Sequence, residues 1–300
     1  MDYPSEKVRI AAPYAHTYRF RVKQKEAGKT IADLLHERFP FRSVQEWEKR
    51  IELGRVKLND KPTSAQTLLK EYDVVAHFNP RVIEPSVPDD VRILQETEDF
   101  LFVFKPAPMP VHSGGRYFKN ALTGVLDDYG YKKLHIIHRL DAVTSGILLF
   151  GKSKAFAQKA QQWFKENQVE KEYLALVAGV PDKDEFSCDS PISRDKGYKF
   201  KSGTAPGAKS AFTRFRVMER YERHTMMKCF PKTGRTHQIR LHLQDCGYPI
   251  ANDPVYGPKS EKTEYQNRAI FLLHSRFSIP QENITCEIPL PESWLVGIGG

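Results

Sequence analysis

A polar stretch between two short apolar runs most strongly restricts how this chain can fold. The runs at residues 134–137 and 147–150 are rich in branched and aromatic side chains, so we expect two buried strands. Between them, residues 138–146 read His-Arg-Leu-Asp-Ala-Val-Thr-Ser-Gly. A carboxylate on such a loop is held by rigid neighbours. We therefore expect Asp141 to be the chemical centre. The alternative is that Arg139 and Asp141 form a purely structural ion pair.

The second apolar run also belongs to a nucleotide-binding pattern. Residues 146–153, Gly-Ile-Leu-Leu-Phe-Gly-Lys-Ser, match the P-loop letter for letter. A phosphate cradle needs a loop whose exposed amides point at the anion, whereas the central four residues themselves form an apolar strand pattern. We therefore expect a strand at these residues. The alternative is a P-loop phosphotransferase, and a failure to bind ATP would exclude it.

The histidines and cysteines do not show the spacing of a metal site. His135 and His138 would point to opposite faces of a strand, and His237 and His242 would diverge on a helix. No acidic ligand lies at a motif distance from either pair. The sequence therefore predicts no metal. The four cysteines form no Cys-x-x-Cys pair, and we expect them to be reduced.

The overall charge favours a polyanionic partner. Lysine and arginine number 46 against 37 acidic residues, a formal net charge of +9, and clustered cations gain affinity by releasing counterions from phosphates. With 300 residues, 40% of them hydrophobic, the chain can bury one large core or two smaller ones. It contains no run of 18 apolar residues and no apolar segment near residue 1. We expect a cytoplasmic protein without membrane spans, monomeric by default.

Composition shifts along the chain divide it into four segments. Residues 79–91 contain three prolines, several acidic residues and few apolar ones, which is typical of a semi-rigid linker. Before it, residues 1–18 are expected to be an N-terminal extension and residues 19–78 a small domain. After it, residues 92–300 are expected to form the larger, catalytic domain.

The small domain is predicted to be α+β. Apolar spacing indicates a strand at 19–22 and helices at 30–38 and 44–53, the second with a capping box formed by Ser43 and Glu46. Short strands follow the helices. This order resembles the S4 domain, a small RNA-binding module, on the positions Ser43, Ile51, Gly54, Val56 and Asn59. The cations that could form its RNA-facing surface, rather than a merely solvated face, are Arg38, Arg42, Lys49, Arg50, Arg55 and Lys57.

The larger domain is rich in strand patterns. These fall at residues 100–104, 134–137, 147–150, 173–177, 212–217, 226–230 and 271–273. Helical patterns are fewer and fall at residues 121–129, 155–167 and 236–246. Because strands and helices do not alternate regularly, we expect an α+β fold around a large mixed or antiparallel sheet rather than a doubly wound one.

Two further segments carry polar groups on otherwise apolar patterns. Residues 233–243, Thr-Gly-Arg-Thr-His-Gln-Ile-Arg-Leu-His-Leu, join a glycine turn to a helix start, which places Arg235 where an anion is favoured. Tyr173 interrupts the apolar strand pattern of residues 171–177, and its hydroxyl needs a partner there. Taken singly, Tyr173 could be ordinary core and Arg235 an ordinary surface residue.

Together, the three segments resemble the RluA-type family of pseudouridine synthases. The shared motifs are His-Arg-Leu-Asp-x-x-Thr-Ser-Gly at 138–146, Lys-x-Tyr-Leu-Ala-Leu-Val-x-Gly at 171–179 and Thr-Gly-Arg-Thr-His-Gln-Ile-Arg-x-His-Leu at 233–243. The resemblance spans residues 92 to 290 and extends to Lys105-Pro106-Ala107 upstream and Leu273-His274 downstream. It implies the pseudouridine synthase fold, for which an S4-like domain is a usual companion.

The resemblance also implies roles for four residues. Asp141 matches the family's nucleophile, which lets uracil leave C1′ of its ribose, rotate and rejoin through C5; attack at C1′, attack at C6 and proton abstraction all remain open. Arg235 matches the arginine that pairs with the catalytic aspartate, and Tyr173 the ring that stacks on the target base. Arg139 matches the arginine that replaces the flipped uridine in the RNA stack. No cofactor is implied, and the partner is ribosomal or transfer RNA.

The basic segment at residues 194–209 is a second candidate RNA contact. Its cations alternate with Tyr198 and Phe200, a combination that suits backbone binding and base stacking, although a solvated hairpin has the same composition. The main rival function is a non-catalytic RNA-binding or assembly protein on the same fold. Binding alone does not require Asp141, Tyr173 and Arg235 together, so we favour the enzyme.

Overall fold

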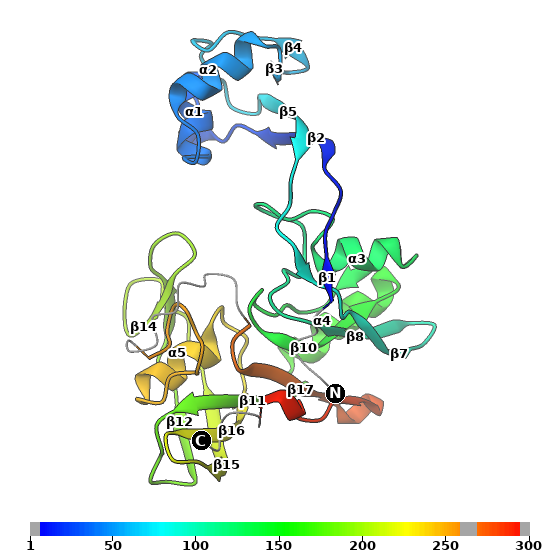
Figure 1. Ribbon diagram of the computed structural model, residues 1–300, viewed down its shortest axis with the longest axis vertical. Helices are drawn as coiled ribbons and strands as arrows, with labels where there is room; N and C mark the ends of the chain where they lie inside the picture. The colour runs from blue at the N-terminus through cyan, green and yellow to red at the C-terminus, as the bar shows by residue number, and fades with distance from the viewer. Residues whose placement is uncertain (1–6, 259–268, 295–300) are drawn as a thin grey trace. The chain divides into compact units, whose positions relative to one another are not determined.

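The computed structural model describes residues 7–258 and 269–294, and the chain folds as two compact units (Figure 1). The smaller unit is Ala11–Glu84. The larger unit combines the residues from Pro85 onward with the N-terminal residues up to Ile10. The boundary after Glu84 thus lies inside the segment 79–91 that the composition indicates as a linker.

The sheet of the smaller unit extends beyond the limits expected from sequence. Strand β2 (Tyr14–Arg21) pairs antiparallel with β5 (Val74–Val82). Residues 14–18 are therefore strand rather than extension, and residues 79–82 are strand rather than linker. The missed signal is the period of two in β2, where half-buried ring side chains alternate with exposed residues.

The two predicted helices of the smaller unit are confirmed. Helix α1 (Ile31–Arg38) begins after Thr30, whose side chain accepts a hydrogen bond from a backbone amide of the first turn. Helix α2 (Val44–Glu52) has the predicted capping box, in which Ser43 and Glu46 each bind the other's backbone amide. Such caps satisfy amides that have no partner inside the helix.

A four-stranded sheet in the order β2-β5-β3-β4 completes the smaller unit. Strands β3 (Val56–Leu58) and β4 (Lys61–Pro62) form a hairpin whose two turn residues, Asn59 and Asp60, both have positive φ, as a two-residue hairpin turn requires. The buried side chains that join helices and sheet are Val22, Ile31, Leu34, Leu35, Trp47, Ile51, Val56 and Val75. This unit therefore has a hydrophobic core of its own.

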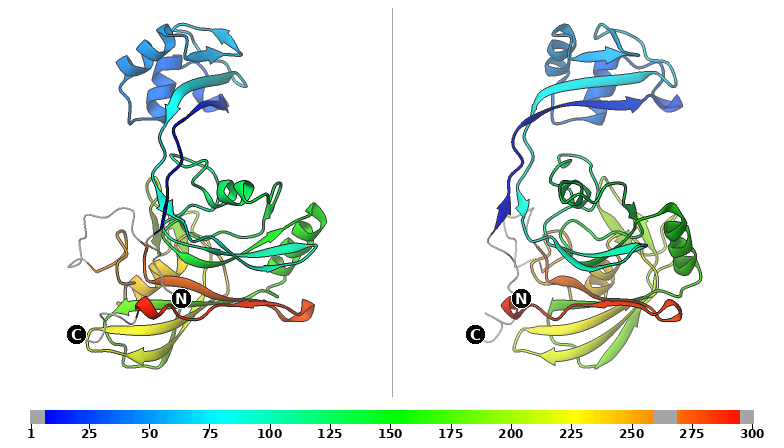
Figure 2. Two further views of the ribbon diagram at one scale, coloured as in Figure 1. Left: turned by 45° about the vertical axis from the view of Figure 1, so that its right-hand side comes forward. Right: turned by 90° about the vertical axis from the view of Figure 1, so that its right-hand side faces the viewer.

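The larger unit is built on a mixed sheet of ten strands in the described part of the chain (Figure 2). The main path runs β12-β15-β16-β11-β17-β10-β8-β7, with β18 beside β17 and β9 beside β10. The bounds are β7 (Arg92–Glu96), β8 (Phe100–Lys105), β9 (His135–Ile136), β10 (Ser145–Gly151), β11 (Glu170–Ala178), β12 (Glu185–Cys188), β15 (Thr213–Arg220), β16 (His224–Pro231), β17 (Leu272–Ile279) and β18 (Ile284–Glu287). Within this sheet the pairing of β10 with β17 is parallel and the others are antiparallel.

Two small ladders lie outside this sheet. Strand β1 (Val8–Arg9) pairs with β6 (Val87–Pro88), which ties the N-terminal residues to the larger unit. Strands β13 (Ile192–Arg194) and β14 (Phe200–Ser202) form the hairpin of the basic segment.

Helices cover both faces of the large sheet. Leu148 and Phe150 of β10 face the core that includes α3 (Leu122–Asp128) and α5 (Gln238–Asp245), whereas Ile147 and Leu149 face the core that includes α4 (Lys154–Lys165). A strand buried on both faces has a continuous apolar run. The strand interpretation of the P-loop-like segment is thereby confirmed, and the fold is α+β as expected.

Candidate active site

Asp141 lies on a tight turn that leads into β10. The amide of Thr144 donates to the carbonyl of Asp141 (3.1 Å), and the amide of Met109 donates to the carbonyl of Ala142 (2.8 Å). The turn is thus anchored by its backbone on both sides, while the Asp141 side chain remains 24% exposed. The Asp141 carboxylate therefore lies at a cavity on a backbone that is held in place.

A buried lysine also supports this turn. The Nζ atom of Lys105, fully buried at the end of β8, donates to the carbonyls of Pro106 (2.9 Å), Met109 (2.8 Å) and Ala142 (3.1 Å). Burial lowers the pKa of Lys105 to about 7, although the nearby charge of Asp141 acts in the opposite direction. Lys105 therefore connects the loop after β8 to the Asp141 turn through backbone carbonyls.

Gly146 lets strands β10 and β17 approach closely at the base of this turn. Its φ is +122°, and a Cβ atom there would lie 2.4 Å from the carbonyl oxygen of His274. No side chain fits that position without moving the backbone. The glycine that ends the His-Arg-Leu-Asp motif is therefore required by the sheet.

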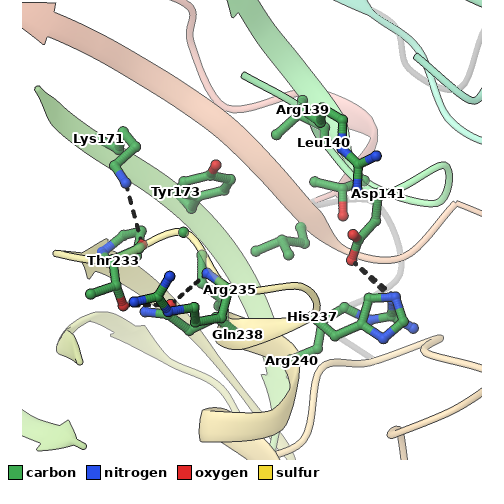
Figure 3. A pocket seen from close by; sticks show the side chains of 15 residues that line it. Arg139, Leu140, Asp141, Lys171, Tyr173, Thr233, Arg235, His237, Gln238 and Arg240 are labelled. Carbon is green, nitrogen blue, oxygen red and sulfur yellow. Dashed lines mark hydrogen bonds and ion pairs between the residues drawn. The ribbon is translucent and has the colours of Figure 1, made fainter. Parts of the chain in front are cut away.

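Arg240 is the cation that binds Asp141 (Figure 3). Its Nη1 donates to Oδ2 of Asp141 at 3.0 Å, while Nε and Nη2 donate to the two carboxylate oxygens of Asp253 at 2.7 and 2.9 Å. Burial disfavours the charged guanidinium, but the hydrogen bond with Asp253 and the charge of Asp141 outweigh it, so the pKa of Arg240 is raised. Arg240 therefore holds the Asp141 side chain in place through a charge-assisted hydrogen bond.

The expected pairing of Arg235 with Asp141 is wrong. The Nε atom of Arg235 donates instead to the carbonyl of Ser210 (3.0 Å), although Arg235 lines the same cavity. Helix α5 begins at Gln238, so Arg235 precedes it, whereas Arg240 lies in its first turn and faces the carboxylate. A signal was present in the sequence, since an arginine between apolar residues of a buried helix needs an acidic partner.

His237 is a second neighbour of Asp141 that sequence reasoning did not assign to the site. It has a left-handed backbone, with φ of 59°, immediately before α5. Its Nε2 lies 3.8 Å from Oδ2 of Asp141, and its Nδ1 is 2.9 Å from the hydroxyl of Tyr256. Burial lowers the pKa of His237 even though Asp141 opposes this. The turn conformation thus brings a ring nitrogen next to the carboxylate.

Tyr173 forms one wall of the site, as Figure 3 shows. It is opposite His274 in the ladder of β11 and β17, next to a bulge at Glu172, and the two rings stack with centroids 4.4 Å apart. Burial raises the pKa of the Tyr173 hydroxyl and lowers that of His274 to about 3. Both rings are therefore neutral at physiological pH.

Two overlapping cavities surround these groups. One, with about 500 Å³ of empty space, is lined by Asp141, Tyr173, Arg240 and neighbouring residues; the other, with about 1150 Å³, opens beside it and includes Lys171 and Lys232. Arg139 lines both and makes no hydrogen bond or ion pair with the described residues. All four of the predicted site residues therefore line the same cavity: Arg139, Asp141, Tyr173 and Arg235.

The described residues contain no cluster of three or more histidine, cysteine, aspartate or glutamate side chains that could bind a metal ion. In the same part of the chain, none of the helices has the length and apolar character needed to cross a membrane.

Comparison with known proteins gives consistent matches. Residues 99–245 match the family described as RNA pseudouridylate synthase. RNA pseudouridine synthase 7 of Oryza sativa is 36% identical over 88% of this chain and 70% of its own length. The mitochondrial tRNA pseudouridine(32) synthase of Saccharomyces cerevisiae is 31% identical over 85% of this chain, which spans 56% of the yeast protein.

The fold also matches a solved structure. Human RNA Pseudouridylate Synthase Domain Containing 1 superposes with a TM-score of 0.60 and 26% identity, covering 72% of this chain and 89% of that one. Sequence and fold thus give the same assignment.

Proposed function

Because the chain belongs to the family of RNA pseudouridylate synthases, enzymes that convert uridine in RNA to pseudouridine, we propose that Asp141 is the nucleophile of this reaction. The observation that carries the proposal is the ion pair between Asp141 and the buried Arg240, at the edge of a cavity walled by Tyr173. An ionised carboxylate held in place beside the bound nucleotide is the group that such a reaction requires.

The overall reaction exchanges one bond of the nucleotide for another. The bond from N1 of uracil to C1′ of ribose breaks, a bond from C5 to C1′ forms, the C5 proton is released and N1 gains a proton. Asp141 can attack C1′ or C6 or take up a proton; each of these roles needs a carboxylate, which Arg240 holds in place. No step in this balance consumes an oxidant or reductant.

Tyr173 and Arg139 have supporting roles in the proposal. The Tyr173 ring is backed by His274, so its other face is available to stack on the detached uracil. Arg139, which has no intramolecular partner among the described residues, fills the gap that the flipped uridine leaves in the RNA stack. Arg235 binds substrate without contacting Asp141.

Replacement of the nucleophile tests the proposal directly. Asp141→Asn is expected to reduce tritium release from 5-tritiated uridine in RNA by at least about a thousandfold, while RNA affinity stays within a few-fold of wild type. Asp182→Asn, at an exposed position outside the cavities, is the matched control and keeps full activity. An unchanged rate of release in Asp141→Asn would refute the role.

Substrate identity is best sought by mapping pseudouridines in total RNA from cells with and without the protein. We propose structured RNA, transfer or ribosomal, as the target, and a transfer RNA is the first to test because a relative is named for position 32 of tRNA. A pseudouridine that disappears identifies the site. Full cellular function of Asp141→Asn with every pseudouridine retained would instead support the non-catalytic RNA-binding alternative.

A further inference from the structure

A third cavity adjoins the site on the side of Lys171. It has about 1260 Å³ of empty space and is lined by Asn167, Val169, Glu170, Lys171, Glu172, Arg214, Phe230, Pro231, Lys232 and Arg276. Among the described residues, Lys171 is the one that lines all three cavities. In the view of Figure 3, Tyr173 lies between Lys171 and Asp141. Lys171 therefore stands where the reaction cavity and the third cavity meet.

Lys171 has no carboxylate partner among the described residues. Its Nζ makes one long hydrogen bond, to the carbonyl of Thr233 at 3.3 Å. The carboxylates on either side of Lys171 form ion pairs with other cations: Glu172 with Lys228 at 2.7 Å and Glu170 with Arg276 at 3.9 Å. Burial lowers the pKa of Lys171 to about 8, so the ammonium is charged at neutral pH at a cost in free energy. An anion from outside the chain would remove that cost.

The third cavity presents further cations and an aromatic ring. Arg214 lies over the ring of Phe230 at 4.8 Å, and Lys232 lies over the ring of Phe212 at 5.3 Å. Neither Arg214 nor Lys232 forms an ion pair with a described carboxylate. Cations that follow a groove beside an aromatic ring are typical of surfaces that bind single-stranded nucleic acid.

We infer that Lys171 binds a backbone phosphate next to the target uridine, and that the third cavity holds the RNA strand continuing from that phosphate. The inference rests on the proposed function, because it takes the target nucleotide to lie beside Asp141. It goes beyond that function by assigning the path of the flanking strand. Arg214 and Lys232 then bind later phosphates, and Phe230 stacks on an unpaired base.

The test combines protein variants with a neutralised phosphate. The probe is the RNA in which mapping finds the lost pseudouridine or, if none is lost, the RNA cross-linked to the protein in cells. Lys171→Gln is expected to lower the affinity for this RNA roughly tenfold at low salt. It should also reduce the slope of log affinity against log salt concentration by about 1, whereas Lys171→Arg largely restores both quantities. The control is Lys159→Gln, an exposed lysine on α4 paired with Glu282, with little effect on either.

Methylphosphonate linkages identify the phosphate itself. Placed one at a time along the bound strand, a neutral linkage is expected to cost wild type roughly tenfold in affinity at one position, and to cost Lys171→Gln nothing further there. If every neutral linkage affects the two proteins equally, or if none weakens wild type, the inference is overturned. Where Lys171→Gln fails to fold, the linkage scan of wild type still tests the inference, because the absence of any sensitive position overturns it.

Tritium release measured beside binding separates the two proposals. Normal release by wild type with equal linkage effects in both proteins means that the Lys171 site is wrong and the proposed function stands. Absence of release together with the expected linkage effect at one phosphate means that the RNA path is right and the proposed chemistry is wrong.

Discussion

Arg240 joins two carboxylates that come from distant parts of the chain. Asp253 accepts a bidentate pair of hydrogen bonds from Arg240, and its side chain is fully buried. Asp141 accepts a hydrogen bond from the remaining guanidinium nitrogen, and its side chain is exposed to the cavity. Two hydrogen bonds fix the plane of the guanidinium, so its third interaction fixes the carboxylate of Asp141. Asp253 is therefore a positioning residue for Asp141.

Replacement of Arg240 should damage both folding and activity. Arg240→Met leaves Asp253 buried without its cation, so the free energy of unfolding is expected to fall by about 3–5 kcal/mol. Arg235→Met, whose guanidinium binds a backbone carbonyl, is expected to change it by less than about 1 kcal/mol and to weaken RNA binding. Urea unfolding of both variants checks this, and an equal loss of stability would contradict the assignment.

Lys105 gives a pH-dependent prediction. Its pKa is about 7 when folded and about 10.5 when unfolded, so between these values the unfolded chain binds one proton more and stability rises with pH. Lys105→Met should lose this rise, and it should also be less stable at pH 9 because the buried carbonyls that the Lys105 amine binds lose their donor. Urea midpoints from pH 7 to 9.5 provide the measurement. Parallel curves for variant and wild type would count against the shifted pKa.

At the scale of elements, β10 links the chemistry to the cores on both faces of the sheet. Its four apolar residues alternate between the two cores, and the turn carrying Asp141 directly precedes it. Gly146 aligns it with β8 on one side and β17 on the other. The position of Asp141 is thus set by a strand that packing allows to shift very little.

Adding a methyl group at Gly146 should break this arrangement. In Gly146→Ala, the Cβ clashes with the backbone of His274, and strands β10 and β17 have to separate. We expect a loss of at least about 2–3 kcal/mol in unfolding free energy, together with a large fall in activity. Gly114→Ala serves as the control, because nothing lies within 4 Å of its added Cβ. A stable, active Gly146→Ala would show that the strands can adjust.

At the scale of the whole molecule, the cations behind the net charge of +9 occur in both units. In the smaller unit, Arg42, Arg50 and Arg55 lie near His77, whose pKa falls to about 4 through burial and these charges. None of the three forms an ion pair with a described carboxylate. Arg38, in contrast, binds the buried Glu26 at 2.5 Å, so it does not belong to the predicted RNA-facing surface.

A pair of matched double variants tests this surface. Replacing Arg42 and Arg55 by Gln is expected to lower RNA affinity and to reduce the salt slope by about 1 to 2, with the rate at saturating RNA unchanged. Replacing Arg19 and Lys29 by Gln removes the same charge from residues already paired with Asp60 and Glu37, and should have a smaller effect. Equal effects of the two double variants would indicate that net charge alone matters.

Features governed by neighbouring residues could be predicted from the sequence alone. The capping box of Ser43 and Glu46, the helices, the apolar strand at 147–150 and the location of Asp141 on its turn follow from local spacing and apolar periodicity. The S4-like identity of the smaller unit, its RNA-binding role, the monomeric state and the cytoplasmic location stay predictions. The motifs further indicated that Asp141, Tyr173 and Arg235 meet, and they do share a cavity.

The partners within the site were decided only by the tertiary structure. Which of two arginines five residues apart reaches Asp141 depends on where helix α5 begins, and the left-handed turn at His237 sets that start. The stacking of Tyr173 on His274 depends on strand register. Among the described residues, Lys171 has no carboxylate partner because Glu170 and Glu172 form ion pairs with cations from other strands. Local sequence determined the elements and the position of Asp141 on its turn, because those depend on adjacent side chains; the electrostatic partners depend on distances between segments far apart in the chain.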